Sequence, residues 1–258
     1  MIRHGYLLPE MTYLVSYPRS GANWLRYCIE RISARATLGV SPKDPLTPLD
    51  RSVEEAVREV LGATLGVDLT QDAIMQHSHR WHESDKTTRV VMIVRNPKEC
   101  ILRDYRGQMP DDDRLRRIIS EDSLSVLCNR DGIGDYAGLL EALVQHPADK
   151  RHVVYFEDLK LNPRETLREC MQFMNTPDLE PQLEDFMEHI DRHNKVSVVV
   201  YNNGVSKSYT RGTNAISHHS DEFLSIEDKI KWDEYIKENH PTIVPLVERY
   251  FEPETSDG

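Results

Sequence analysis

Three short apolar segments limit what this chain can fold into, because a segment with helical spacing follows each of them. They span Thr12–Tyr17, Arg89–Val94 and His152–Tyr155. After its arginine, the second is an apolar run without alternating polar residues, which is typical of a strand covered on both faces. Strands that alternate with helices predict an α/β fold. We therefore expect one domain, residues 1–258, with a mainly parallel central sheet flanked by helices.

The first of these strands leads into a tight turn, Pro18–Gly21, and an amphipathic helix is predicted from Ala22 to about Ala36. The first amides of a helix lack intrahelical acceptors, and the helix dipole adds positive potential there. A turn at this point therefore favours a phosphate-like anion. Arg19 adds a cation and Ser20 a hydroxyl donor. The segment predicts a P-loop-like binding turn, although the G-x-x-x-x-G-K-[ST] pattern is absent.

A second strand–turn–helix unit follows at Arg95-Asn96-Pro97, where the Arg89–Val94 strand ends. Ligands of parallel sheets bind at the carboxyl ends of the strands, so both turns are expected at one site. Spacing and capping residues predict the further helices 52–61, 98–106, 114–127, 135–145, 163–174, 178–190, 225–238 and 242–250. Residues 73–80 and 196–201 have strand character, and the polar, glycine-containing segment 202–220 is predicted to be a mobile loop.

The charge and the composition exclude some classes of protein. A net charge of −11 argues against a nonspecific nucleic-acid binder, whose surface is normally basic. We find no basic-then-apolar signal pattern at the N-terminus and no apolar run of membrane-spanning length. The cysteines are far apart, without a C-x-x-C pair. These features predict a cytoplasmic protein without membrane insertion, and they leave the oligomeric state open, a homo-oligomer included.

Four segments resemble motifs of the sulfotransferases that depend on 3′-phosphoadenosine 5′-phosphosulfate (PAPS). Ser16–Trp24 (SYPRSGANW) resembles the phosphosulfate loop of that family, T-Y-P-K-S-G-T-x-W. Val94–Glu99 (VRNPKE) is similar to its 3′-phosphate segment, R-N-P-K-D. Tyr155–Lys160 (YFEDLK) resembles Y-E-D-L-K, and Arg211-Gly212 resembles R-K-G. The first two segments, in this order, carry most of the specificity of the resemblance.

The resemblance implies a site with two phosphate positions. The residues that would hold the 5′-phosphosulfate are Arg19, Ser20, Gly21, Ala22 and Asn23. Arg95 would bind the 3′-phosphate, and Arg211 and Gly212 would close over it. Arg103 stands where the family has a serine, eight residues after Arg95, and either replaces a hydroxyl contact with a charged one or points into solvent.

Two aromatic residues and one cation complete the expected nucleotide contacts. Trp24 would stack on the adenine, the alternative being a core tryptophan, and Phe156 would pack near the adenine where relatives often have a tyrosine. Arg19 stands where the family has a lysine at the leaving oxygen. An arginine keeps the charge but does not readily give up a proton. The alternative for Arg19 is an ordinary surface arginine after a turn.

The catalytic base implied by the resemblance is His79, in a His77-Ser78-His79 segment that matches a K-T-H or K-S-H motif. A neutral imidazole suits proton abstraction near neutral pH. His77 replaces the family's lysine and removes a permanent charge. A metal site is the competing reading, because His77 and His79 share one side of a strand and His82 follows closely. We favour the base and expect no metal.

The implied activity is transfer of a sulfuryl group from PAPS to a hydroxyl or amine of a small-molecule acceptor, leaving the bisphosphate PAP. Positioning and electrostatics would supply most of the acceleration. The alternatives are a P-loop-like kinase that uses ATP and magnesium, and a relative that binds nucleotide without turnover. The substitutions at Arg19, Ala22 and Arg103 keep the last alternative open.

Overall fold

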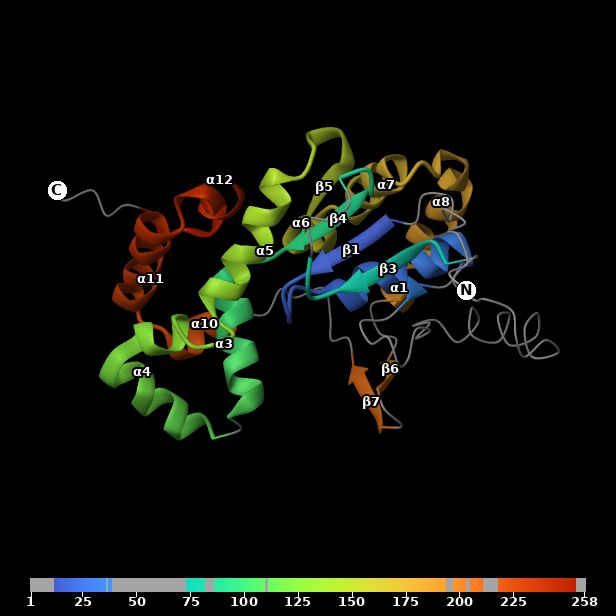
Figure 1. Ribbon diagram of the computed structural model, residues 1–258. Helices are drawn as coiled ribbons and strands as arrows, with labels where there is room; N and C mark the ends of the chain where they lie inside the picture. Colours follow the sequence, from blue (N-terminus) through green and yellow to red (C-terminus); the bar gives the residue numbers. More distant parts are fainter. Residues whose placement is uncertain are drawn as a thin grey trace, which may run out of the picture.

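In the computed structural model of the protein, the residues that the structure describes include five parallel strands that form the central sheet (Figure 1). In spatial order they are β2 (Thr37–Leu38), β3 (Met75–Ser78), β1 (Thr12–Ser16), β4 (Val90–Val94) and β5 (Arg151–Tyr155). The first described strand, β1, therefore lies in the middle, with β3 on one side and β4 on the other. The structure describes residues 12–35, 37–38, 73–81, 86–109, 111–193, 197–202, 205–210 and 218–253.

Both faces of the sheet are buried. All of β4 is buried: Val91 and Ile93 belong to the hydrophobic cluster on one face, and Met92 belongs to the cluster on the other. In β1, Leu14 and Val15 divide between the same two clusters. A strand covered on both sides has no solvent face, which explains the unbroken apolar run in the sequence.

Helices form a layer on each face (Figure 1). One layer contains α1 (Ala22–Ser33), α6 (Phe156–Leu161), α7 (Pro163–Phe173) and α8 (Glu180–Glu188). The other contains α3 (Pro97–Gln108), α4 (Asp112–Leu127), α5 (Ile133–Gln145), α11 (Ile226–Asn239) and α12 (Val244–Val247). Each helix turns an apolar stripe to the sheet or to its neighbours, as Leu25, Ile29 and Ile32 do in α1. This arrangement confirms the predicted α/β fold with a parallel sheet.

The remaining elements are short. They are α9 (Ile190–His193), α10 (His219–Phe223), the antiparallel strands β6 (Ser197–Asn202) and β7 (Val205–Thr210), and the 3-10 turns Ala148–Lys150, Pro177–Leu179, Pro241–Ile243 and Glu248–Tyr250. The prediction of a mobile loop over 202–220 was wrong for β7, which pairs with the β-branched run of β6 along its whole length.

The last predicted helix, 242–250, was also wrong as a single element. It is divided into a 3-10 turn, the four-residue α12 and a second 3-10 turn. Pro245 lies in the first turn of α12. A proline is tolerated there because a first-turn amide has no intrahelical acceptor, but its missing N–H prevents it from continuing a preceding helix. The predicted helix 52–61 lies outside the described residues. Within the described part of the chain, no helix has the length and apolar character needed to cross a membrane.

A buried ion pair between Lys98 of α3 and Asp233 of α11 connects the C-terminal elements to α3. The Lys98 ammonium donates to the Asp233 carboxylate at 2.6 Å and to the Tyr250 carbonyl at 2.8 Å. Burial lowers the pKa of Lys98 and raises the pKa of Asp233, while the attraction between the two opposes both shifts. Each charge therefore needs the other in order to stay buried.

Replacing one member of this pair is predicted to destabilise the fold. The variant Asp233→Ala leaves the Lys98 ammonium buried without its carboxylate and should lower the free energy of unfolding by about 3–5 kcal/mol. Urea unfolding measures the change. The control is the double variant Lys98→Met/Asp233→Leu, which removes both charges and should keep most of the stability. A single variant as stable as the wild type would contradict this account.

Candidate functional site

Four strands end beside one another at the same edge of the sheet, and each is followed directly by a predicted site residue or segment. His79 follows β3, the turn Tyr17–Gly21 follows β1, Arg95 follows β4 and Phe156 follows β5. Because these four strands are neighbours and parallel, segments far apart in the sequence meet there. The predicted convergence of the two turn motifs is therefore present in the structure.

The turn after β1 has an unusual backbone. Arg19 has φ 68° and Gly21 has φ 97°, so both residues are in the left-handed region. The Ser20 amide and hydroxyl both donate to the Tyr17 carbonyl, at 3.3 and 2.7 Å, which closes the turn. Gly21 is the N-cap of α1 and, having no side chain, makes no side-chain cap bond to the first-turn amides. The turn thus presents a helix N-terminus to an anion.

Gly21 is required at this point because Phe156 packs directly on its backbone. A Cβ atom at Gly21 would lie 2.3 Å from Phe156 Cδ2. On the same ring, the Arg95 guanidinium carbon lies 4.3 Å from the centroid. Arg95 also donates to the Arg19 carbonyl at 3.2 Å. Phe156 therefore supports both the turn and Arg95, in addition to any contact it makes with an adenine.

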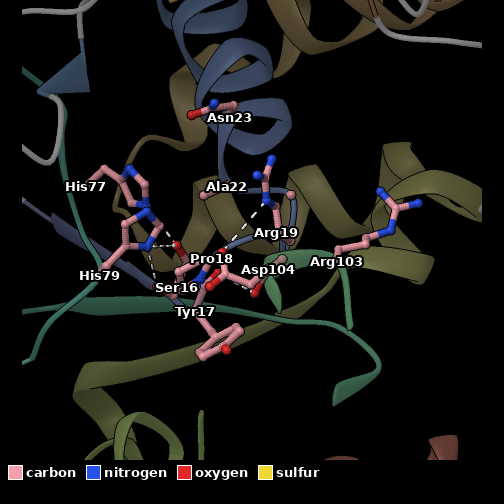
Figure 2. A pocket seen from close by; sticks show the side chains of 12 residues that line it. Ser16, Tyr17, Pro18, Arg19, Ala22, Asn23, His77, His79, Arg103 and Asp104 are labelled. Atoms are coloured by element: carbon pink, nitrogen blue, oxygen red, sulfur yellow. Dashed lines mark hydrogen bonds and ion pairs between the residues drawn. The ribbon is translucent and has the colours of Figure 1, made fainter. Parts of the chain in front are cut away.

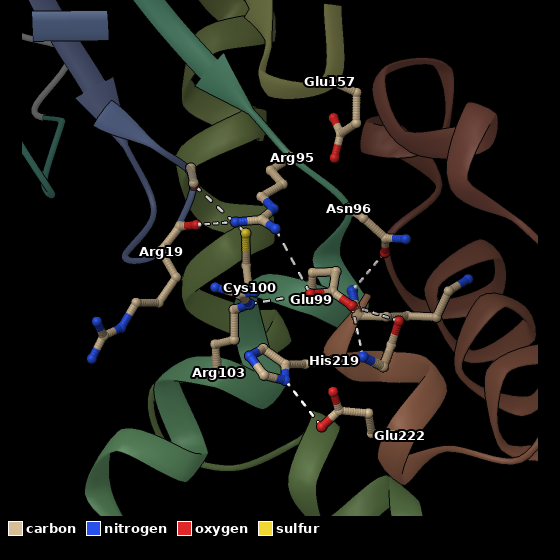
Figure 3. A network of polar contacts seen from close by, with 12 residues as sticks. Arg19, Arg95, Asn96, Glu99, Cys100, Arg103, Glu157, His219 and Glu222 are labelled. Carbon is tan, nitrogen blue, oxygen red and sulfur yellow. Dashed lines mark hydrogen bonds and ion pairs between the residues drawn. The ribbon is translucent and has the colours of Figure 1, made fainter. Parts of the chain in front are cut away.

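One buried carboxylate, Glu99, connects two of the arginines (Figure 3). Its Oε2 accepts from Arg103 Nε at 3.1 Å and lies 3.8 Å from Arg95 Nη2. Its Oε1 accepts from the Ser220 amide and hydroxyl at 2.6 and 2.7 Å. Burial and the neighbouring Arg95 lower the pKa of Arg103. Glu99 thus holds the Arg95 and Arg103 guanidinium groups near one another, an arrangement suited to a phosphate-like anion.

Two adjoining cavities lie against this edge. The first has a volume of about 360 Å³ and is lined by Ser16, Tyr17, Pro18, Arg19, Ser20, Gly21, Ala22, Asn23, His77, His79, Arg103 and Asp104 (Figure 2). The second, of about 440 Å³, is lined by Arg19, Arg103, Arg106, Gly107, Asp112 and His219. Arg19 and Arg103 line both cavities, and their guanidinium groups make the shared boundary basic. Arg106 forms a two-point ion pair with Asp112, at 2.8 and 2.7 Å.

His79 lines the first cavity with a defined tautomer. Its Nδ1 lies 2.7 Å from the Ser16 carbonyl oxygen, which can only accept, so Nδ1 carries the hydrogen and Nε2 keeps a lone pair. Burial lowers the pKa of His79, and Arg26 acts in the same direction, while the bond to Ser16 and the charge of Asp104 oppose the shift. His79 is therefore neutral at pH 7, with Nε2 able to accept a proton.

Arg19 extends into solvent at the mouth of the cavity. Its side chain is 44% exposed, and its Nε lies 3.9 Å from Asp104 Oδ1. Asp104, Arg106 and His219 are lining residues that the sequence motifs did not reveal. The helical spacing of Arg103 and Arg106, one turn apart on α3, was the available signal for one of them.

Three other residues predicted to contact the nucleotide, Trp24, Arg211 and Gly212, are not among the described residues that line the cavities. Trp24 is 5% exposed, stacks on Tyr27 at a centroid distance of 5.7 Å, and has the Lys160 ammonium 4.7 Å from its ring centroid. It lines neither cavity, and its stacking on adenine stays a prediction. Arg211 and Gly212 lie outside the described residues.

The competing metal reading gains no support from the part of the chain that the structure describes. No group of three His, Cys, Asp or Glu side chains there is placed to hold a metal ion. His82, the third imidazole of that reading, lies outside the described residues. Glu157 accepts from the Tyr250 hydroxyl, and Asp158 forms an ion pair with Arg249, so both carboxylates contact the C-terminal segment.

Gly21→Ala is predicted to disturb the turn. The positive φ and the contact with Phe156 both oppose a Cβ atom, so the free energy of unfolding should fall by about 1–3 kcal/mol. The matched control is Gly134→Ala on α5, where a Cβ meets nothing within 4 Å and should leave stability equal or slightly higher. Urea unfolding compares the two. Equal effects of both substitutions would contradict the assigned geometry.

Comparisons with known proteins agree with this architecture. The mouse sulfotransferase SULT7A1, solved in complex with PAP, superposes with a TM-score of 0.53 at 17% identity over 93% of this chain and 89% of its own. A retinol dehydratase solved with retinol and PAP gives 0.50 at 11% identity over 90% and 82%. At such identities these likenesses concern the fold.

Sequence comparison gives the family. A WSCD family member of Aedes aegypti is 23% identical over 176 residues, 65% of this chain. The match covers 51% of that relative, so the chain spans about half the length of the curated protein it matches. The family model of the sulfotransferase domain matches residues 9–247, nearly the whole chain. The chain therefore belongs to the sulfotransferase domain family.

Proposed function

We propose that the protein transfers a sulfuryl group from PAPS to a hydroxyl or amine of a small-molecule acceptor, with His79 as general base. The observation that carries the proposal is the pairing of a neutral His79 with the anion-binding turn in one cavity. The Nδ1–H of His79 is used by the Ser16 carbonyl, so Nε2 is the nitrogen that would take a proton from the acceptor.

The residues present fit a nucleotide with two phosphate positions. The turn supplies a helix N-terminus without a side-chain cap, and Gly21 lets the backbone come close to Phe156 and to a ligand. Arg95 and Arg103 both face the carboxylate of Glu99 and would supply two neighbouring guanidinium groups to a dianionic phosphate. Arg106 and His219 line the second cavity, next to Arg103.

Bound PAPS supplies an activated sulfuryl group whose transfer leaves PAP. The chain's own residues would then act by position and charge. His79 Nε2 accepts the acceptor proton, and its Nδ1–H stays bonded to Ser16, which fixes the ring. Arg19 and the turn amides lower the energy of negative charge developing on the leaving oxygen. Because an arginine does not readily release a proton, Arg19 is assigned charge stabilisation and not acid catalysis.

The variant His79→Ala tests the base directly. We expect turnover, measured as PAP release with a mixed acceptor panel, to fall by about 10²–10⁴-fold, while PAP affinity measured by calorimetry stays near the wild-type value. The matched control is His189→Ala. His189 also bonds a backbone carbonyl through Nδ1, to Asp185 at 3.0 Å, but lines neither cavity. Unchanged turnover in His79→Ala would remove this residue from the mechanism.

The variant Arg103→Met tests the 3′-phosphate position. Loss of a charge-assisted contact should weaken PAP binding about tenfold to a hundredfold. Adenosine 5′-monophosphate lacks the 3′-phosphate, so its affinity should change little. Arg117→Met, at an exposed position on α4, is the control for a general loss of positive charge. Equal weakening of both nucleotides, or of neither, would contradict the assignment.

A further inference from the structure

The Ser16 side chain lies beside the two histidines of the His77-Ser78-His79 segment and contacts both (Figure 2). The parallel pairing of β1 and β3 sets Leu14 opposite His77 and Val15 opposite Ser78, which brings the end of β1 beside His79. The Ser16 hydroxyl lies 2.8 Å from His77 Nε2 and 3.3 Å from His79 Nδ1. The two imidazole rings meet edge to face, with centroids 4.7 Å apart.

The burial of His77 determines which group donates in these contacts. His77 is 3% exposed, and its buried Nδ1 has no hydrogen-bond partner among the described residues. A buried N–H without an acceptor is rarer in proteins than a buried lone pair without a donor. His77 is therefore assigned the tautomer in which Nε2–H donates to the Ser16 hydroxyl. A lone pair of that oxygen then faces the Nδ1–H of His79.

We propose that His77 and Ser16 are positioning residues that hold His79 in its Nδ1–H tautomer and stabilise the imidazolium formed when His79 takes a proton. Ser16 would offer His79 two acceptors, its carbonyl at 2.7 Å and its hydroxyl at 3.3 Å. His77 acts through Ser16 by fixing the direction of the hydroxyl. The proposal rests on the proposed function of His79 as base.

The charges around the pair agree with this arrangement. Arg26 on α1 and Asp104 on α3 are the charged groups that act on His79, with opposite effects. Burial, His79 and Arg26 hold the pKa of His77 well below its usual value, so His77 is neutral at pH 7. A neutral neighbour lets His79 become positively charged without repulsion from position 77, which a lysine there would exert.

The test compares two pairs of variants. Ser16→Ala removes the hydroxyl that serves His79 as a second acceptor. His77→Phe removes the N–H that donates to this hydroxyl. Ser16→Thr keeps the hydroxyl, and His77→Gln keeps a side-chain N–H donor. We expect kcat to fall about tenfold in the first two and to recover in the second two, with acceptor KM and PAP affinity little changed. The pH midpoint of kcat/KM should move lower in Ser16→Ala and His77→Phe, because a less stabilised imidazolium releases its proton more readily.

Nitrogen-15 NMR of the histidine side chains reads the tautomer without any activity. The Nδ1–H form of His79 should dominate in the wild type and in His77→Gln. In Ser16→Ala the main-chain carbonyl of residue 16 remains and should preserve this tautomer, while the Nδ1–H resonance should shift because the second acceptor is lost. A wild-type spectrum with the Nε2–H form, or an unchanged kcat in Ser16→Ala, would overturn the proposal. Loss of kcat in His77→Gln equal to that in His77→Phe, with equal loss of thermal stability, would assign His77 a packing role only. Because the tautomer is measured directly, failure of His79 as base would be recognised separately, by full turnover in His79→Ala.

Discussion

Arg19 and Gly21 both adopt positive φ, and the turn that contains them stands at the carboxyl end of the middle strand of the sheet. This backbone directs the amides of the α1 N-terminus toward the cavity and the Arg19 carbonyl toward Arg95. It also brings Gly21 within van der Waals contact of Phe156, on which Arg95 stacks. One left-handed turn therefore joins the ends of β1, β4 and β5 into a single rigid edge.

The charges at that edge are arranged around an anion. The chain as a whole carries a net charge of −11, yet Arg19, Arg95, Arg103 and Arg106 gather at this edge. Glu99 lowers the cost of burying Arg95 and also pairs with Arg103. Burial lowers the pKa values of His77 and His79, so both side chains stay neutral. The proposed base therefore carries no charge that would alter the charge of the neighbouring arginines.

Features encoded locally were predicted from the sequence. The apolar strand of residues 90–94, the Pro18–Gly21 turn and the helices that follow both turns depend on short-range patterns, and the structure contains them. The contact of Glu99 with Ser220 joins residues 121 positions apart, so no short-range sequence pattern predicts it. The packing of Phe156 beneath Gly21 is likewise a product of strand order. The role of Trp24 could not be predicted either, because its position in the motif does not show whether Tyr27 or a ligand stacks on its ring.

Donor identity is the most direct test of the central claim, that this edge of the sheet serves sulfuryl transfer. The wild-type protein would be incubated with the same acceptor mixture and either PAPS or ATP with magnesium, and the products would be followed by mass spectrometry. We predict PAP and an acceptor heavier by one sulfuryl group from the first reaction, and no ADP from the second. Formation of ADP and a phosphorylated acceptor, with PAPS left unconsumed, would contradict the account.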